Sequence, residues 1–243
     1  MPSPFSIFSR KKSKVRLPFK DYYADWLHTL NHKLLPLLRH SLSSSSPTLL
    51  SSRTDLLLHH ILSYYHSLDH AASPPTIPHL LFPSWNHATP FLFLGDLHPY
   101  LFTNLLRSFL DGSNQETLPP WTDPSRHLIT RLDQIECGLR LMVPALVDRI
   151  RKAQEKFVAA VVNNWVASEG KKMAVAETMN VEMEEMVSVF LDANRLRRSV
   201  ILEIIGAMSD YQAAVFLEGL ARFLVGFGGP ALLAEFGELQ LGS

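Results

Sequence analysis

The chain has 243 residues, 47% of them hydrophobic and 19% charged, and its formal net charge is zero. This composition can bury a core as one large or two small domains and excludes an intrinsically disordered protein. The first twenty residues lack the apolar segment of a signal peptide, Pro2 excludes an N-myristoyl signal, and the one cysteine, Cys137, excludes an intrachain disulfide. We therefore expect an intracellular protein rather than a secreted enzyme.

The N-terminal segment is strongly basic. Residues 1–20 contain no acidic residue, so residues 21–243 carry a net charge of minus six. We interpret residues 1–18 as a basic flexible arm that contacts an anionic membrane leaflet or protein partners. A nuclear-import or nucleic-acid patch and a solubilising tail are the alternatives. The cations are Arg10, Lys11, Lys12, Lys14, Arg16 and Lys20.

The first half of the chain predicts two helices and an extended connector. Aromatic and leucine residues recur at steps of three and four from Phe19 to about His40, which is typical of an amphipathic helix. The segment SLSSSSP predicts a flexible connection, and a second helix is expected from Leu49 to about Leu68. Prolines at 74, 75, 78 and 83 predict an extended connector up to Trp85.

The run from Phe91 to Leu110 is apolar but interrupted. Charged and polar residues within it disfavour a membrane span. Gly95 ends one apolar segment, and Asp96 or His98 is expected to cap a helix that has Pro99 in its first turn. We interpret the run as a buried joint of a helical fold.

The second half predicts long helices. Asp123 as cap and Pro124 predict the start of a long helix, which Pro144 is expected to kink. The GKK sequence at 170–172 predicts the next turn, followed by a helix from Met173 to about Arg197. Ser209 and Gln212 form a capping box for the last helix. The apolar face expected for the long helix comprises Ile129, Leu132, Ile135, Leu139, Met142, Leu146, Ile150, Phe157, Val161 and Trp165.

The predicted fold is therefore all-α, a single domain over residues 19–243 with about six to eight long, partly kinked antiparallel helices. Nothing repeats at a fixed period, which argues against a solenoid. Residues expected to be largely buried are Trp26, Trp85, Leu105, Leu132, Leu139, Phe157, Trp165, Phe216 and Leu220.

Motifs for catalysis and cofactor binding are absent from the sequence. It contains no GxxxxGK[ST], GxGxxG, HExxH, CxxC or GxSxG. Two histidine pairs, 28 with 32 and 66 with 70, have a spacing that can place two metal ligands on one helix face, but polar surface positions are the simpler interpretation. Cys137 and the methionines at 173, 179, 183 and 186 are interpreted as core residues. We therefore predict no catalytic residue, metal site or cofactor.

Three blocks resemble the plant delay-of-germination domain, which also forms the C-terminal half of TGA-type bZIP factors. They are FKDYYADWLHTLNHKLLPLLRHSL, PSWNHATPFLFLGDLHPYLFTNLLRSFL and MSDYQAAVFLEGLARFLVGF. The resemblance covers residues 19–230, and His98 stands where the family usually has arginine. The residues that match the family pattern, interpreted as structural, are Trp26, Trp85, Gly95, Pro99, Gln212, Ala213 and Ala214.

The arm before FKDYY, the missing bZIP region and the histidine in the middle block resemble a pollen branch of that family. This resemblance implies a non-enzymatic plant protein that marks plasma-membrane domains of developing microspores, where exine is not deposited and apertures form. It implies membrane-associated protein partners and a cytoplasmic protein that is peripheral at the plasma membrane. The histidines that bind haem in one seed-dormancy branch have no match here, so haem is not carried over.

Two other functions stay open from the sequence. A transcriptional cofactor related to the TGA factors would use the arm for nuclear import and would reach DNA through a partner, because no zipper follows the arm and no direct DNA binding is expected. A helical sensor would hold haem or a fatty acyl chain beside residues 91–110. A monomer and a homo-oligomer are both open.

Overall fold

The structure, a computed structural model, describes residues 19–44, 46–86, 91–110, 121, 124–166 and 169–226. Its elements are α1 (Phe19–Thr29), a π-helical turn η1 (Leu30–Leu34), α2 (Leu35–Leu42), α3 (Pro47–Ala71), α4 (Ile77–Leu81), β1 (Leu92–Phe93), β2 (Asp96–Leu97), α5 (Tyr100–Leu110), α6 (Arg126–Val166), α7 (Glu169–Gly206) and α8 (Asp210–Gly226). The all-α class is confirmed, since the sheet consists of two antiparallel strands of two residues each.

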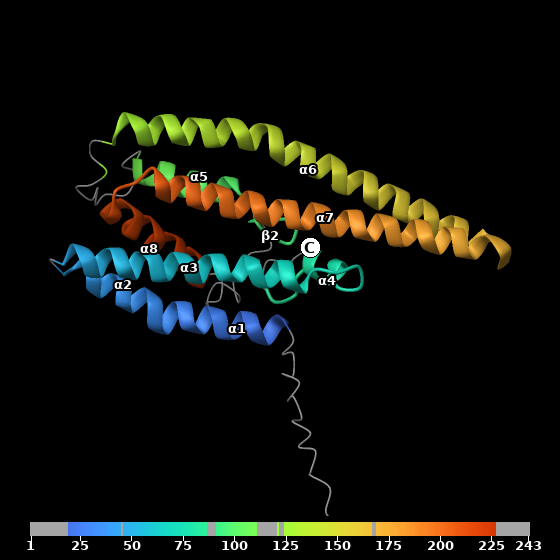
Figure 1. The fold of residues 1–243 in the computed structure, drawn as a ribbon, viewed down its shortest axis with the longest axis horizontal. Coiled ribbons are helices and arrows are strands. Elements are labelled where there is room, and N and C mark those ends of the chain that lie inside the picture. Colours follow the sequence, from blue (N-terminus) through green and yellow to red (C-terminus); the bar gives the residue numbers. More distant parts are fainter. Residues whose placement is uncertain are drawn as a thin grey trace, which may run out of the picture.

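The helices lie in layers. α6 and α7 form a long antiparallel pair on one side, and α3 lies beside the rod of α1, η1 and α2 on the other, with α5, α8 and the short hairpin between them (Figure 1). One end of the α6 and α7 pair extends past the other described helices. The predicted arrangement of long antiparallel helices is confirmed.

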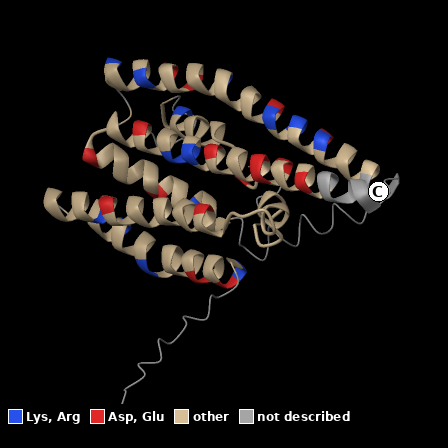
Figure 2. Ribbon diagram, turned by 45° about the vertical axis from the view of Figure 1, so that its right-hand side comes forward, with Lys and Arg blue, Asp and Glu red and all other residues tan. Residues whose placement is uncertain are grey.

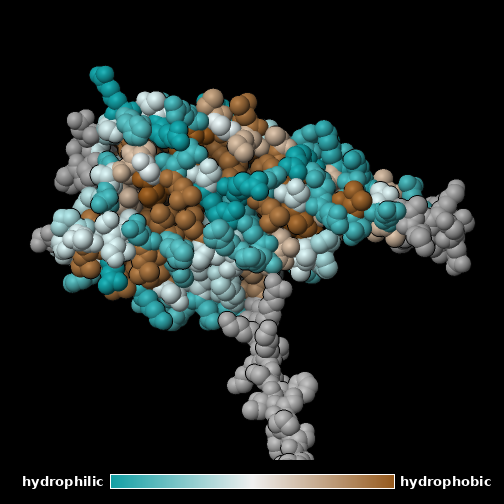
Figure 3. Space-filling model, viewed as in Figure 1, coloured by the Kyte–Doolittle hydropathy of each residue, from teal (hydrophilic) through white to brown (hydrophobic). Residues whose placement is uncertain are grey.

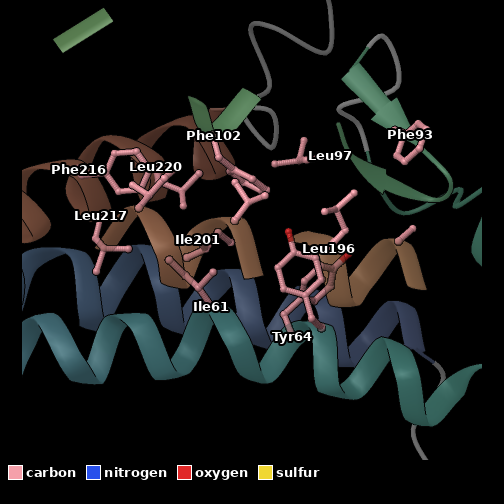
Figure 4. Packing of buried hydrophobic residues seen from close by; sticks show 14 of the residues in the cluster. Ile61, Tyr64, Phe93, Leu97, Phe102, Leu196, Ile201, Phe216, Leu217 and Leu220 are labelled. Carbon is pink, nitrogen blue, oxygen red and sulfur yellow. The ribbon is translucent and has the colours of Figure 1, made fainter. Parts of the chain in front are cut away.

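One continuous hydrophobic core fills the space between the layers. Phe102 of α5, Phe216 of α8 and Leu97 of the hairpin converge with Ile61 of α3 and Ile201 of α7 (Figure 4). Each of these five side chains is at most 2% exposed. The core contains buried residues from α1, with Trp26, through to α8, with Ala221.

The first helical block matches the predicted one from Phe19 to about His40, but it contains a π turn. Leu35 N–H donates to the carbonyl of Leu30, five residues back. Pro36 follows directly, and it has no N–H and a ring that crowds the carbonyl four residues before it. The wider turn accommodates that proline without ending the helix.

The proline-rich connector was predicted to contain no helix, and that is wrong for α4. Pro78 lies in the first turn of this helix, where its missing N–H removes no intrahelical bond. The Thr76 hydroxyl closes the preceding turn by donating to the Ala71 carbonyl at 2.6 Å. Buried Ile77 and Leu80 then hold the short helix on the core.

The start of α6 and its buried face differ from the prediction. The helix begins at Arg126, and Ser125 caps it through its hydroxyl, which accepts from Leu128 N–H at 3.1 Å. The predicted cap Asp123 lies outside the described residues. Leu128 and Val143 are buried, while the predicted Ile129 and Met142 are 40% and 49% exposed.

Pro144 lies inside α6 without ending it, and the ribbon changes direction in this middle part (Figure 1). The predicted kink without two separate helices is confirmed. The predicted turn at GKK is wrong, because α7 already begins at Glu169 and includes residues 170–172. The helix also continues to Gly206, beyond the predicted end near Arg197.

Most of the predicted core is confirmed. Trp26, Leu132, Leu139, Phe216 and Leu220 are buried. Trp85, Leu105 and Phe157 are only partly buried, although they pack against the core. The prediction for Trp165 falls on a side chain outside the described ones, and the core prediction for Cys137 is wrong, because its side chain is exposed.

The capping box of the last helix is confirmed. Ser209 N–H donates to Gln212 Oε1 at 3.1 Å, and Gln212 N–H donates to the Ser209 hydroxyl at 3.3 Å. Ala213 and Ala214 behind this cap are buried. Across the described helices, none is long and apolar enough to cross a membrane.

Candidate functional site

The middle sequence block folds into a tight hairpin between α4 and α5. Gly95 forms its turn with a φ of 85°, after Leu94 with a φ of 47°. A Cβ at Gly95 would lie 2.2 Å from the Leu80 carbonyl oxygen and 2.9 Å from the Phe190 ring. Only glycine fits this position, because both the backbone conformation and the space exclude a side chain.

Arg197 of α7 is fully buried and binds the main chain of the hairpin. Its guanidinium Nε donates to the Leu97 carbonyl at 2.8 Å. The remaining donors bind the carbonyls of Phe93 and Asp96 and the side-chain oxygen of Asn194. The buried charge is thus surrounded by acceptors from the hairpin main chain, which offsets the cost of removing it from water.

A second polar contact joins α7 to α3. Asn194 Nδ2 donates to Asp69 Oδ1 at 2.9 Å, and Arg198 forms an ion pair with the other carboxylate oxygen. Sequence reasoning missed this group and Arg197. Yet Phe190, Asn194, Arg197 and Ile201 follow one another at steps of three and four, so the buried stripe of α7 includes them.

Asp96 lies at the centre of the hairpin and is 2% exposed. Its Oδ1 accepts from Leu97 N–H at 2.5 Å, and burial raises the pKa of the carboxyl while the Arg197 guanidinium opposes that change. Burial beside Asp96 also raises the pKa of the Tyr23 and Tyr64 hydroxyls. The enclosed space next to these groups measures about 10 Å³, enough for one water molecule and no substrate.

His98 and Pro99 start α5 as predicted. Tyr100 N–H donates to His98 Nδ1 at 3.3 Å, so the imidazole acts as the helix cap in place of Asp96. Burial, with the Arg197 charge as a further cause, lowers the pKa of His98, and the neutral ring has the free lone pair that this cap requires. The hairpin centre is thus a structural device that places α5.

The two tryptophans of the family pattern, Trp26 and Trp85, make contacts that involve α1. Trp26 Nε1 donates to the His60 carbonyl at 2.9 Å, while His60 Nε2 lies 3.0 Å from the Trp26 carbonyl and the two rings stack. Trp85 packs against Phe19, with ring centroids 5.2 Å apart. Trp26 therefore joins α1 to α3, and Trp85 joins the loop after α4 to the start of α1.

The predicted basic arm lies outside the described residues except for Lys20, which is exposed at the start of α1. The rings of His28 and His32 stack at 4.3 Å, and His32 Nδ1 lies 3.2 Å from the His28 carbonyl. Over the described ranges, no three His, Cys, Asp or Glu residues gather as metal ligands. Met186 is buried and Met183 is packed on the core, as predicted.

A groove of about 480 Å³ lies between α6 and α7. Its apolar wall comprises Ile135, Leu139, Met142, Leu146, Leu196 and Val200, and charged residues lie at its rim. Arg149 at this rim pairs with Glu185 at 2.9 Å and Asp192 at 2.7 Å. An apolar floor with a charged rim is typical of a surface that binds another protein.

Charges of both signs gather along α6 and α7 toward the extended end of the pair (Figure 2). Many of them pair with one another, such as Arg151 with Asp148 and Glu155. Exposed apolar residues form several separate areas among hydrophilic ones on the face in Figure 3. Small separated apolar areas of this kind are usual on folded proteins and do not by themselves mark a binding site.

Comparison with known proteins gives two kinds of likeness. The family model for seed dormancy control, DOG1, matches residues 34–108, which include the hairpin. The chain is 52% identical over 272 residues to the Arabidopsis thaliana protein INAPERTURATE POLLEN1, covering 98% of this chain and 99% of that protein. It is 36% identical over 235 residues to the INAPERTURATE POLLEN 1 homolog of Oryza sativa subsp. japonica, covering 93% of this chain and 91% of the homolog.

Proposed function

The chain belongs to the INAPERTURATE POLLEN1 family and contains a match to the seed dormancy control model, and on that premise we propose that it acts in forming pollen apertures. The observation that carries the proposal is the 52% identity to the Arabidopsis protein, which extends over nearly the full length of both chains. Neither the family model nor the relatives' names denote an enzyme. We therefore assign it a non-enzymatic role in aperture formation.

The finer part of the proposal is a mechanism of assembly. The protein marks domains of the microspore plasma membrane by binding membrane-associated proteins, and so specifies where exine is not deposited. The groove between α6 and α7 supports this role, because Met142 within it is 49% exposed and its rim offers charged partners. The basic arm adds peripheral attraction to an anionic leaflet.

The buried hairpin centre supports a non-catalytic role. Its titratable groups, Asp96, Tyr64 and Arg197, are enclosed and face a space for one water molecule. A general acid or base has to reach its substrate within hydrogen-bond distance. These groups instead position the hairpin on α7.

The test is complementation in plants that lack the Arabidopsis relative. The chain is expressed as a fluorescent fusion, apertures are scored on mature pollen, and the fusion is located at the tetrad stage. Restored apertures together with discrete peripheral patches support the proposal. A purely nuclear signal would contradict membrane marking and favour a transcriptional cofactor. Pollen without apertures despite stable expression of the fusion would contradict the aperture role.

A further inference from the structure

The surface around α4 is uncharged and adjoins the basic arm. Residues 70–95 contain no Asp, Glu, Lys or Arg, whereas α7, on which α4 packs, carries many charged side chains. Their described part comprises α4, the loop to Trp85 and Asn86, and the first strand of the hairpin. This surface can therefore approach an apolar phase without the cost of removing charged side chains from water.

Phe82 is the most exposed large apolar side chain among the described residues, at 75%. It directly follows α4, whose Ile77 and Leu80 are buried beneath it. Pro83 comes next and is buried as well. The buried residues on both sides fix the main chain here and leave the Phe82 ring at the surface.

The arm enters the domain beside this ring. Phe19 and Lys20 line a hollow of about 430 Å³ together with Phe82 and Trp85. Arg16 is three residues before Phe19, so their Cα atoms lie within about 11 Å of each other, and Arg10 is within about 32 Å. The five cations of residues 1–18 are therefore joined to the domain at Phe19, which lines the same hollow as Phe82.

We propose that this end of the molecule docks on an anionic lipid leaflet, with the Phe82 ring entering the interface and Lys20 and the arm binding the headgroups. The inference rests on the proposed peripheral membrane contact and specifies which surface makes it. Basic residues beside an exposed aromatic ring are the combination that interfacial binding uses, because each signal alone gives weak attachment.

The charges of α1 define the orientation. Asp25 in the second turn of this helix is exposed and would be repelled by an anionic surface, while Asp21 in the first turn directly follows Lys20. The N-terminal end of α1, with Lys20 and the neighbouring α4 loop, therefore faces the leaflet, and the length of α1 does not lie flat on it. An anionic leaflet is favoured over a protein partner because the adjoining segment, residues 1–20, has six cations and no acidic residue.

The test measures binding of the full-length chain to vesicles of phosphatidylcholine alone and of phosphatidylcholine with phosphatidylserine, by co-sedimentation. Phe82→Ser is compared with the matched control Leu141→Ser, since Leu141 of α6 is 72% exposed on another part of the molecule. We expect Phe82→Ser to weaken binding to the anionic vesicles about tenfold, from the apolar area that the ring buries. Leu141→Ser should leave binding unchanged.

Both variants should keep the wild-type melting temperature, because both side chains are largely exposed. Equal vesicle binding by wild type and Phe82→Ser would overturn the proposal, and so would equal losses in the two variants. Loss of peripheral patches in microspores without a loss of vesicle binding would assign Phe82 to a protein contact instead. Weaker vesicle binding with fully restored apertures would support this docking surface and contradict the membrane part of the proposed function.

Discussion

The guanidinium of Arg197 donates a hydrogen bond of 2.8 Å to the main-chain carbonyl of Leu97, one hundred residues earlier in the chain. This contact joins α7 to the hairpin that precedes α5. It uses a fully buried cation to bind main-chain carbonyls inside an apolar core. The position of the family-pattern block is therefore set by a residue outside it.

Replacing Arg197 by methionine should destabilise the protein by about 3 to 5 kcal/mol, because the hairpin carbonyls lose their donors and Asp96 loses its neighbouring cation. The matched control is Arg195→Met on the same helix. Its side chain is 74% exposed and pairs with Asp192, so the cost should be below about 1 kcal/mol. Urea unfolding of the two variants measures the difference, and similar losses would mean that the buried network contributes little.

Gly95→Ala should cost at least about 2 kcal/mol in the free energy of unfolding. The new Cβ would meet the Leu80 carbonyl at 2.2 Å, and the positive φ disfavours alanine. Gly138→Ala is the control, since it adds a Cβ with no atom within 4 Å in the middle of α6. That variant should be more stable than wild type by about 0.5 to 1 kcal/mol, so the two substitutions are expected to shift the thermal midpoint in opposite directions.

How much of this fold the sequence predicted depends on the range of the interactions. The capping box at Ser209 and the cap of α5 were predicted because both are local. The strands of the hairpin have two residues each, too few to show an alternating pattern. Arg197 lies in a run with Asp192, Arg195 and Arg198, and such a charged run is typical of a solvent-exposed helix face. Pro78 was read as a helix breaker, although its place in the first turn is a permitted one.

The candidate site was less predictable than the fold. The family-pattern residues Trp26, Gly95 and Pro99 were identified and interpreted as structural. Trp26 donates to the His60 carbonyl, Gly95 has no room for a side chain, and the Pro99 carbonyl accepts from Phe102 N–H at 3.2 Å. Phe82 was missed, because a phenylalanine between Leu81 and Pro83 suggests a buried position, whereas its side chain is 75% exposed. The α6 and α7 groove was missed because Met142, which lines it and is 49% exposed, was placed on the buried face of the long helix.

His60 makes stability depend on pH. Burial lowers its pKa in the folded protein, so folding favours the neutral ring that stacks on Trp26. Its contribution is complete above the unfolded value of about 6.5 and is lost as the pH falls from there toward the folded pKa. Wild type should therefore lose more stability than His60→Gln between about pH 7.5 and pH 5.5 in parallel urea titrations. Parallel pH profiles for the two proteins would contradict this assignment.

Met142→Glu should abolish aperture formation while leaving vesicle binding intact, because it places a charge on the apolar floor of the α6 and α7 groove. The control is Val158→Glu, which adds the same charge on α6 at a side chain that is 59% exposed and outside the groove lining. Complementation and co-sedimentation are measured for both variants. Normal apertures with Met142→Glu would contradict the proposal that the α6 and α7 groove binds the protein partner.

Changing Arg10, Lys11, Lys12, Lys14 and Arg16 to alanine should weaken binding to anionic vesicles by up to about 5 kcal/mol, at about 1 kcal/mol for each cation near the surface. Wild-type binding should fall steeply between low and physiological salt, because charges in water are screened over about 8 Å at physiological ionic strength. Co-sedimentation at two salt concentrations measures both effects. The melting temperature should not change, since these residues precede the first apolar helix.

The salt dependence separates the arm from Phe82. Apolar burial does not depend on charge screening, so Phe82→Ser should lower binding by a similar factor at both salt concentrations, whereas the five-alanine variant should approach a salt-independent remainder. Combining the substitutions should remove that remainder, because the two signals contribute through different forces. If the five-alanine protein binds anionic vesicles as well as wild type does and still forms peripheral patches, the arm serves only solubility. Targeting would then depend on the protein partners of the helical domain.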